Sequence, residues 1–226
     1  MTKIIAVMNH KGGVGKTTTT INLAAALQQK KKRVLVIDLD GQANLTESFG
    51  LSIEEEQTVY GAMKGEYPLP LVGLSNGLTV VPSCLDLSAA ESELINEPGR
   101  ELILKGLIAK TLDTRKFDYV LIDCPPSLGL LTLNALTAAH YLIIPVQAQF
   151  LAMRGMAKIT NVVATVRERL NPALEIGGIV ITQFDGRKTL NKSVAELVKD
   201  AFCDKVFQTV IRDNVSLAEA PIKGKD

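Results

Sequence analysis

Residues 11–18 read Lys11-Gly12-Gly13-Val14-Gly15-Lys16-Thr17-Thr18, and this stretch decides the fold. The apolar run of residues 4–8 before it is typical of a short buried strand, and residues 19–27 after it have the spacing of a helix. A glycine-rich turn between a strand and a helix aims backbone N–H groups at one point and lets an anion approach the chain closely. The sequence therefore predicts a phosphate-binding loop.

Two side chains of this loop have the chemistry that a bound nucleotide needs. Lys16 is placed to reach the β- and γ-phosphates, and the Thr17 hydroxyl is placed to ligate Mg²⁺. The loop departs from the common pattern G-x-x-x-x-G-K-[ST], because His10 stands where that pattern has its first glycine and Lys11 adds a second lysine. An accidental Gly/Lys turn is the alternative, and the strand and helix on the correct sides disfavour it.

Aspartates follow two further apolar runs. The run at 34–37 ends in Asp38 and Asp40, and the run at 119–122 ends in Asp123. Because ligands bind at the carboxyl ends of the strands in open α/β sheets, we expect these carboxylates near the phosphate loop. An aspartate at such a strand end commonly holds Mg²⁺, which is our interpretation of Asp123. Helix capping is the alternative role for Asp38 and Asp40.

The rest of the chain alternates between apolar runs and helical spacings, which favours a parallel sheet with helices on both faces. We predict one α/β domain over residues 1–226, with a doubly wound, mostly parallel sheet flanked by helices. The further expected strands are at 78–81, 141–144, 179–182 and 206–210, with a loop-rich section at 68–77. The expected helices are at 85–94, 101–112, 128–138, 152–170 and 190–202, with shorter pieces at 44–51 and 58–63.

Composition excludes several function classes. The net charge is +1, so binding to a polyanion requires a local patch rather than the field of the whole protein. No apolar run is long enough to span a bilayer. The three cysteines, far apart in the sequence, have no metal-site spacing and are expected as reduced thiols of a cytosolic protein. Aromatic residues make up 4% and tryptophan is absent, which argues against a stacking surface for single-stranded nucleic acid.

Four segments together resemble the ParA/Soj family of partition ATPases, in the ParA/MinD group with its deviant Walker A loop. They are the loop K-G-G-x-G-K-[ST]-[ST] at 11–18 and the segments at 38–44, 123–127 and 214–221, in the order found in the family. The resemblance implies a protein that binds ATP with Mg²⁺ and then forms a homodimer. Each ATP would be enclosed between two protomers.

The resemblance implies a role for each catalytic residue. Lys16 would hold the phosphates within its own protomer, and Lys11 of each protomer would reach the phosphates held by the other. A cation supplied by a partner stabilises the charge that spreads over the phosphoryl oxygens, as an arginine finger does. Asp40 would orient the attacking water. Thr18 and the loop N–H groups would hold the α- and β-phosphates.

The resemblance also implies the remaining ATP-site residues. Thr17 and Asp123 would hold the metal, with Asp38 as a further candidate for the same metal shell. Arg212 and Asn214 would lie near the nucleoside.

Nonspecific binding of the ATP dimer to duplex DNA is a further implication of the resemblance. A ParB-like partner protein would stimulate hydrolysis, and the protein would be cytoplasmic and associated with the nucleoid. Arg187 matches a basic position used for DNA in the family, and Lys188, Lys192 and Lys223 are expected to join it. The run 30–33, Lys-Lys-Lys-Arg, is expected as a solvated helix cap, with a DNA contact as the second interpretation.

Some residues differ from the family pattern. Ser216 replaces a usual arginine, Asp213 falls where a usual Pro-Arg pair ends, and Gly41 replaces a proline. The chain also stops at Asp226, before the last helix usual in the family. These differences concern the DNA-binding surface and leave the ATP site intact.

Two alternatives therefore stay open. One is a MinD/McdA-like positioning ATPase that acts on another cargo or at the membrane. The other is a metabolic enzyme on a related fold, such as dethiobiotin synthetase. Nitrogenase iron protein is disfavoured because its cluster cysteines have no counterpart spacing here.

Overall fold

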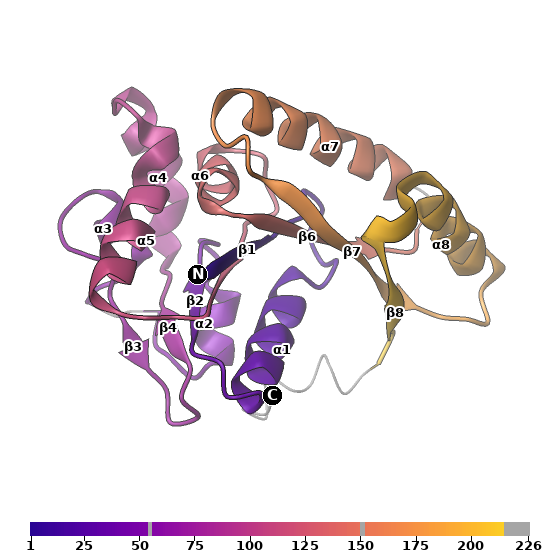
Figure 1. Cartoon of the computed structure of the whole chain (residues 1–226), viewed down its shortest axis with the longest axis horizontal. Coiled ribbons are helices and arrows are strands. Elements are labelled where there is room, and N and C mark those ends of the chain that lie inside the picture. Colours follow the sequence, from indigo (N-terminus) through magenta and orange to yellow (C-terminus); the bar gives the residue numbers. More distant parts are fainter. Residues whose placement is uncertain (54–55, 150–151, 215–226) are drawn as a thin grey trace.

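The computed structural model describes residues 1–53, 56–149 and 152–214 (Figure 1). The strands are β1 (Lys3–Val7), β2 (Val34–Asp38), β3 (Val72–Gly73), β4 (Thr79–Val81), β5 (Tyr119–Asp123), β6 (Tyr141–Gln147), β7 (Glu175–Phe184) and β8 (Val206–Arg212). The α-helices are α1 (Lys16–Gln29), α2 (Asn44–Ser48), α3 (Val59–Met63), α4 (Ala90–Glu93), α5 (Ile103–Thr114), α6 (Leu130–Ala138), α7 (Ala152–Arg169) and α8 (Thr189–Phe202). Short 3₁₀ helices cover Leu85–Ala89, Leu94–Asn96, Arg100–Leu102 and Cys203–Lys205.

The described strands form one sheet in the order β3-β4-β2-β5-β1-β6-β7-β8. Every neighbouring pair is parallel except β3 and β4, which are antiparallel. Helices lie on both faces; in Figure 1, α6 and α7 lie on one side of the strands and α1 on the other. This confirms the predicted single α/β sheet with flanking helices. It also puts β1, which leads into the phosphate loop, between β5 and β6 near the middle.

Both faces of the central strands are buried, which explains why their sequences are continuously apolar. In β2, Leu35 and Ile37 point into the larger core cluster, which includes side chains of α5, α6 and α7. Val34 and Val36 point to the other face, into a smaller cluster beside α1 and α2. Because side chains alternate along a strand, a strand covered on both faces needs apolar residues at every position.

The structure corrects the predicted end of the strand at 141–144. This strand, β6, runs through Pro145 to Gln147, and Pro145 pairs with Val180 of β7. A proline lacks the N–H that a central strand needs, so it is normally confined to a sheet edge. Pairing of β6 with β1 ends at Ile143, so no strand lies on that side of Pro145. At Pro145, β6 therefore has a paired strand on one side only, and the missing N–H of proline costs no hydrogen bond there.

Two other segments differ from the sequence prediction. The expected helix at 85–94 is a 3₁₀ helix followed by the short α4 and another 3₁₀ helix. Its buried side chains, Leu87, Ala90 and Leu94, have the spacing that predicted a helix, but spacings of three and four suit either helix type. The loop-rich section contains the two-residue β3, which is too short to leave a pattern in the sequence.

The carboxyl end of α1 has the hydrogen bonds of a Schellman motif. The N–H of Lys32 donates to the Leu27 carbonyl at 3.1 Å, and the N–H of Lys31 donates to the Gln28 carbonyl at 2.7 Å. Lys31 has a φ of 58°, in the left-handed region where this motif usually has glycine. Lysine is strained in this conformation relative to glycine.

We expect Lys31→Gly to stabilise the protein. Glycine adopts a positive φ without a clash at Cβ, so the substitution should raise the free energy of unfolding by about 1 kcal/mol. Urea unfolding followed by circular dichroism measures the change. Lys30→Gly, at a φ of −82°, is the matched control and should be neutral or destabilising. An equal gain from both variants would contradict the assigned strain.

Candidate functional site

The predicted phosphate-binding loop joins the carboxyl end of β1 to the amino end of α1. Gly13 and Gly15 have φ values of 71° and 85°, in the region that L side chains rarely adopt. Gly15 is the N-cap residue of α1, so the first N–H groups of a 14-residue helix open toward the loop. The two glycines thus give the loop the conformation that turns its backbone donors inward.

Neighbouring strands hold this loop in place. The Thr182 hydroxyl donates to the Val14 carbonyl at 2.8 Å, and the Gln183 amide donates to the Gly13 carbonyl at 2.7 Å. On the other side, the Asn9 carboxamide oxygen accepts the Lys11 N–H at 3.1 Å, while its NH₂ group donates to the Pro145 carbonyl at 2.7 Å. These contacts engage the Gly13 and Val14 carbonyls and the Lys11 N–H, and so they hold the loop in one conformation.

The two lysines of the loop have different surroundings. Lys16 is 7% exposed, and its ammonium makes no hydrogen bond or ion pair with any residue that the structure describes. Lys11 is exposed, and its ammonium donates to the side-chain oxygens of Gln147, the last residue of β6, and of Gln149, which follows the strand. The Lys16 ammonium is thus buried, whereas the Lys11 ammonium is held at the carboxyl end of β6.

Asp123 and Thr17, the predicted metal-binding pair, lie in direct contact. The Thr17 hydroxyl donates to Asp123 Oδ2 at 2.6 Å, and the Thr20 hydroxyl lies 3.4 Å from Oδ1. Asp123 is 1% exposed. Burial, and then the nearby Asp38 carboxylate, raise the pKa of Asp123 to about 8, although Thr17 and Lys16 act in the opposite direction. A buried carboxylate with this pKa favours a proton or a cation beside it.

The oxygens of Thr17 and Asp123 fit Mg²⁺. This ion prefers oxygen ligands and is usually bound by one or two protein groups together with the phosphates of a nucleotide. Among the described residues, no group of three or more His, Cys, Asp or Glu side chains has the geometry to hold a metal on its own. A site of this kind therefore suits a metal that arrives with a nucleotide.

Asp38 holds the chain that follows β2. Its Oδ2 accepts both the N–H and the hydroxyl of Thr46, at 2.9 and 2.7 Å, and its Oδ1 accepts the Asp40 N–H at 3.1 Å. Asp38 is fully buried, and burial raises its pKa to about 6. Its register partner in β5 is Asp123. Asp38 thus lies beside the metal-binding pair, but its oxygens already bind the first turns after the strand, and its role in the metal shell stays a prediction.

Asp40 lies in the turn between β2 and α2 and is partly exposed. The Ser83 hydroxyl donates to its carbonyl at 2.8 Å, which ties the turn to the end of β4. Gly41, which stands where the family usually has proline, is explained by packing. A Cβ at this position would lie 3.0 Å from the Ser88 backbone nitrogen, so a side chain would collide with the 3₁₀ helix at Leu85–Ala89.

The residues predicted near the nucleoside and near DNA share one cavity. Its volume is about 500 Å³, and Arg212, Asn214 and Arg187 all line it. Arg187 is 91% exposed and pairs with Asp185 through two hydrogen bonds of 3.0 Å. Lys188 lies 3.9 Å from the same carboxylate. Two of the predicted DNA-binding cations, Arg187 and Lys188, are therefore partly neutralised, and Arg187 lines the same cavity as the residues predicted near the nucleoside.

Two of the expected features cannot be placed in the site. Lys223 and Ser216 lie outside the described residues.

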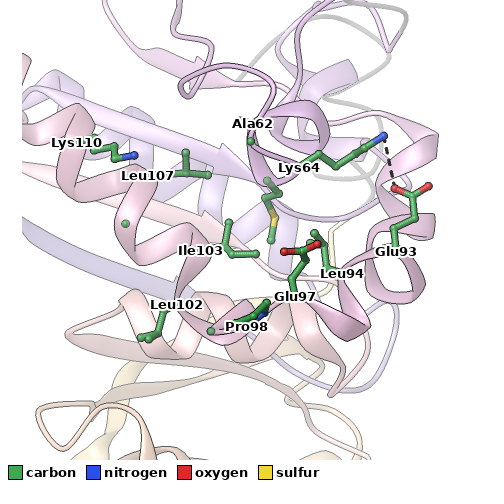
Figure 2. Close-up of a pocket in the computed structure, with 14 residues that line it drawn as sticks. Ala62, Lys64, Glu93, Leu94, Glu97, Pro98, Leu102, Ile103, Leu107 and Lys110 are labelled. Carbon is green, nitrogen blue, oxygen red and sulfur yellow. Dashed lines mark ion pairs between the residues drawn. The ribbon is translucent and has the colours of Figure 1, made fainter.

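A further cavity of about 670 Å³ lies between α3, α4 and α5, and none of the predicted site residues line it. Figure 2 shows its apolar side chains, such as Ile103 and Leu107, with the Lys64–Glu93 ion pair at its rim. Within the described ranges, no helix has both the length and the apolar character to cross a bilayer.

Comparisons with known proteins identify the family. A family model described as an AAA domain matches residues 2–176. The sporulation initiation inhibitor protein Soj of Bacillus subtilis is 44% identical over 229 residues, which cover 100% of this chain and 90% of that protein. The chromosome-partitioning ATPase Soj of Treponema pallidum is 44% identical over 227 residues, which cover 99% and 88%. The chain belongs to the Soj/ParA family.

Solved structures agree with this family fold. Cobyrinic acid a,c-diamide synthase from Mycobacterium smegmatis, with bound ADP and magnesium, has a TM-score of 0.89 and 39% identity, and the match covers 99% of this chain and 91% of that chain. Apo McdA from Cyanothece has a TM-score of 0.90 and 25% identity, with the same coverage. The Soj/ParA chain thus has the fold of these P-loop ATPases.

The residues that sequence reasoning missed all stabilise the loop. Asn9, Thr182 and Gln183 bind loop atoms but carry no charge and belong to no motif that we recognised. One signal was available, because Thr182 and Gln183 follow an apolar run and so end a strand at the ligand-binding edge.

The burial of Asp123 predicts how stability depends on pH. Its pKa is higher in the folded than in the unfolded state, so the folded state binds more protons and loses stability as pH rises from about 4 to 8. Without nucleotide and Mg²⁺, Asp123→Asn should remove on the order of 2 kcal/mol of this loss between pH 5.5 and 8. Thermal unfolding at several pH values measures it. Identical pH profiles for both proteins would contradict the raised pKa.

Proposed function

We propose that this chain is a Mg²⁺-dependent partition ATPase, which binds ATP against the loop at 11–18 and segregates or positions chromosomal or plasmid DNA. The single observation that carries the proposal is the 2.6 Å contact between Thr17 and the buried Asp123, beside Lys16, whose ammonium pairs with none of the described residues. This arrangement suits a metal–triphosphate and has no evident use without one. The names of the two Soj relatives, one of them a chromosome-partitioning ATPase, support the partition role.

In this proposal each residue of the site has one task. The loop N–H groups and Thr18 bind the α- and β-phosphates, and Lys16 binds the β- and γ-phosphates. Thr17 and Asp123 hold Mg²⁺, which neutralises phosphate charge when it is bound. Asp40 accepts a hydrogen bond from the attacking water and aligns it with the γ-phosphate. Arg212 and Asn214 contact the nucleoside from the end of β8.

A homodimer with two ATP molecules between its protomers explains the position of Lys11. Its ammonium points toward Gln147 and Gln149 rather than into its own loop, so it is available to the phosphates of a second copy. Such a cation offsets charge that develops on the γ-phosphate in the transition state. The open space around Gly12, where an added Cβ would meet no atom within 4 Å, is where we expect the partner to approach.

The proposed cycle also includes a ParB-like partner and the nucleoid. The partner protein stimulates hydrolysis. The ATP dimer binds duplex DNA without sequence preference. The protein is cytoplasmic in this proposal, and it is associated with the nucleoid. Arg187 and Lys188 supply phosphate contacts, for which DNA must displace the Asp185 carboxylate.

A positioning ATPase for another cargo is the second candidate, and the likeness to McdA favours it. Both candidates use the same ATP site and differ only in the surface that carries the cargo.

Two substitutions test the ATP site. Lys16→Ala should abolish ATP binding, because it removes the cation nearest the phosphates. Asp40→Ala should retain ATP binding and lose at least about 100-fold in turnover, a typical value for a residue that acts as a base or positions water. Binding of a fluorescent ATP analogue and phosphate release measure the two effects. Asp86→Ala, an exposed aspartate in the neighbouring 3₁₀ helix, is the matched control. Normal turnover in either test variant would refute the assigned role.

Gly12 and Gly15 test the dimer separately from the fold. Gly15→Ala should cost about 1–2 kcal/mol of stability, because its φ of 85° is strained for alanine. Gly12→Ala should leave stability unchanged, because the added methyl group contacts nothing in the single chain. If a second copy covers this spot, Gly12→Ala should still weaken ATP-dependent dimerisation in sedimentation velocity. Undiminished dimerisation of the Gly12 variant would contradict a partner at this position.

A further inference from the structure

Three glutamine side chains lie beside the phosphate loop and are linked to it by hydrogen bonds. Gln147 ends β6 and pairs with Thr182 of β7 in the sheet, so its side chain reaches Gln183, the next residue of β7. The Gln147 NH₂ group donates to the Gln183 side-chain oxygen, and the Gln183 NH₂ group donates to the Gly13 carbonyl at 2.7 Å. The third side chain belongs to Gln149, just after β6. We call Gln147, Gln149 and Gln183 the glutamine cluster.

Lys11 is the cation that this cluster binds. Its ammonium donates to the side-chain oxygen of Gln147 at 3.2 Å and to that of Gln149 at 2.5 Å. The backbone of Gln149 is itself fixed, because its N–H donates to the Gln147 carbonyl at 2.8 Å and its carbonyl accepts the N–H of Ala152 at 2.9 Å. Ala152 is the first residue of α7. The junction between β6 and α7 therefore sets where the acceptors of Lys11 lie.

The glutamine cluster binds Lys11 without neutralising its charge. Amide oxygens carry no net charge, and Lys11 makes no ion pair with any residue that the structure describes. Another cation is close by, because burial, then Lys158 and then Lys11 lower the pKa of His10. The triphosphate of a second copy offers Lys11 an ionised acceptor, which forms stronger hydrogen bonds than a neutral amide does. Lys11 is therefore bound in a way that a phosphate can replace.

The backbone of Gln183 is strained at the point where the cluster meets the loop. Its φ of 49° lies in the left-handed region, which is uncommon for a residue with a side chain. In this conformation the Gln183 side chain contacts both Gln147 and the Gly13 carbonyl. Gly13 belongs to the phosphate loop and has a positive φ of its own, 71°. One series of hydrogen bonds thus connects the position of Lys11 with the conformation of the loop.

We propose that the three glutamines are positioning residues, which retain Lys11 in the single chain and release it only to the ATP of a second copy. The inference rests on the proposed function, because it requires the ATP dimer described above. Lys11 enters the site of another molecule only after its hydrogen bonds to Gln147 and Gln149 are broken. A triphosphate replaces these lost acceptors, whereas an empty loop does not. The glutamine cluster therefore opposes association of copies that carry no ATP.

Two substitutions of the exposed Gln149 test the proposal in the full chain, and they should act in opposite directions. Gln149→Glu gives Lys11 an ionised acceptor within its own chain, so ATP-dependent dimerisation should weaken at least about fivefold near 50 mM salt. Gln149→Ala removes one acceptor, so dimerisation should strengthen about two- to fivefold. Sedimentation velocity with Mg²⁺ and a slowly hydrolysed ATP analogue measures both. Salt screens an exposed ion pair, so the defect of Gln149→Glu should diminish near 500 mM salt, unlike a defect of folding.

A matched variant controls for net charge. Asn96→Glu makes the same change in charge at an exposed position of the 3₁₀ helix Leu94–Asn96 and should dimerise as the parent does. Binding of a fluorescent ATP analogue to the single chain should be equal in all variants, because none of them alters Lys16 or the loop. Equal dimerisation of both Gln149 variants, weaker dimerisation of both, or a defect that salt does not relieve would overturn the role of the cluster alone. A parent protein that binds ATP and stays single would refute the proposed dimer, and this inference with it.

Discussion

The contact between the Thr17 hydroxyl and the Asp123 carboxylate is the constraint on which the functional edge of this protein depends. It joins the first turn of α1 to the end of β5 across 106 residues of sequence, inside a region that water hardly reaches. A carboxylate in such a place is costly unless donors and a cation face it. Thr17, Thr20 and Lys16 all come from α1, so the position of this helix and the position of the phosphate loop are fixed by the same requirement.

Because the strands pair in parallel, carboxylates and cations gather at opposite ends of the sheet. Because β1, β2 and β5 run in the same direction, their carboxyl ends gather Asp38, Asp40 and Asp123 at one edge, while their amino ends gather cations such as Arg33 at the other. The apolar core between the two edges keeps the opposite charges from pairing with each other. The buried Asp123 carboxylate is thus left with Thr17 and Lys16 near it, where a bound cation would compensate its charge.

The phosphate loop and the order of the elements depend on local sequence patterns and could be predicted. Contacts that depend on the register between distant segments could not. The phosphate loop and the order of strands and helices followed from glycine positions and from apolar runs, and the structure agrees with them. The sequence also predicted that Thr17 and Asp123 would share one site. Thr182 and Gln183 were missed because their contact with the loop requires the pairing of β7 with β6, which a single sequence does not reveal.

Errors in the predicted boundaries have the same origin. The strand predicted at 141–144 continues through Pro145 in the structure, because pairing with β1 ends two residues earlier, at Ile143, and leaves that side open. Gly41 differs from the family pattern in the sequence, but the reason is visible only in the structure. Ser88 approaches so closely that a side chain at position 41 would collide with it. Such details depend on which neighbour is present, and that is a property of the tertiary structure.

The outer strand of the sheet has a consequence for how copies of this chain meet. Pairing of β8 with β7 is interrupted by two register shifts, between Ile179 and Ile181 and between Ile181 and Phe184. Irregular pairing of this kind bends and twists a strand, so its free backbone groups no longer form the straight row that another strand could join. Extension of the sheet by a further strand beside β8 is thereby discouraged.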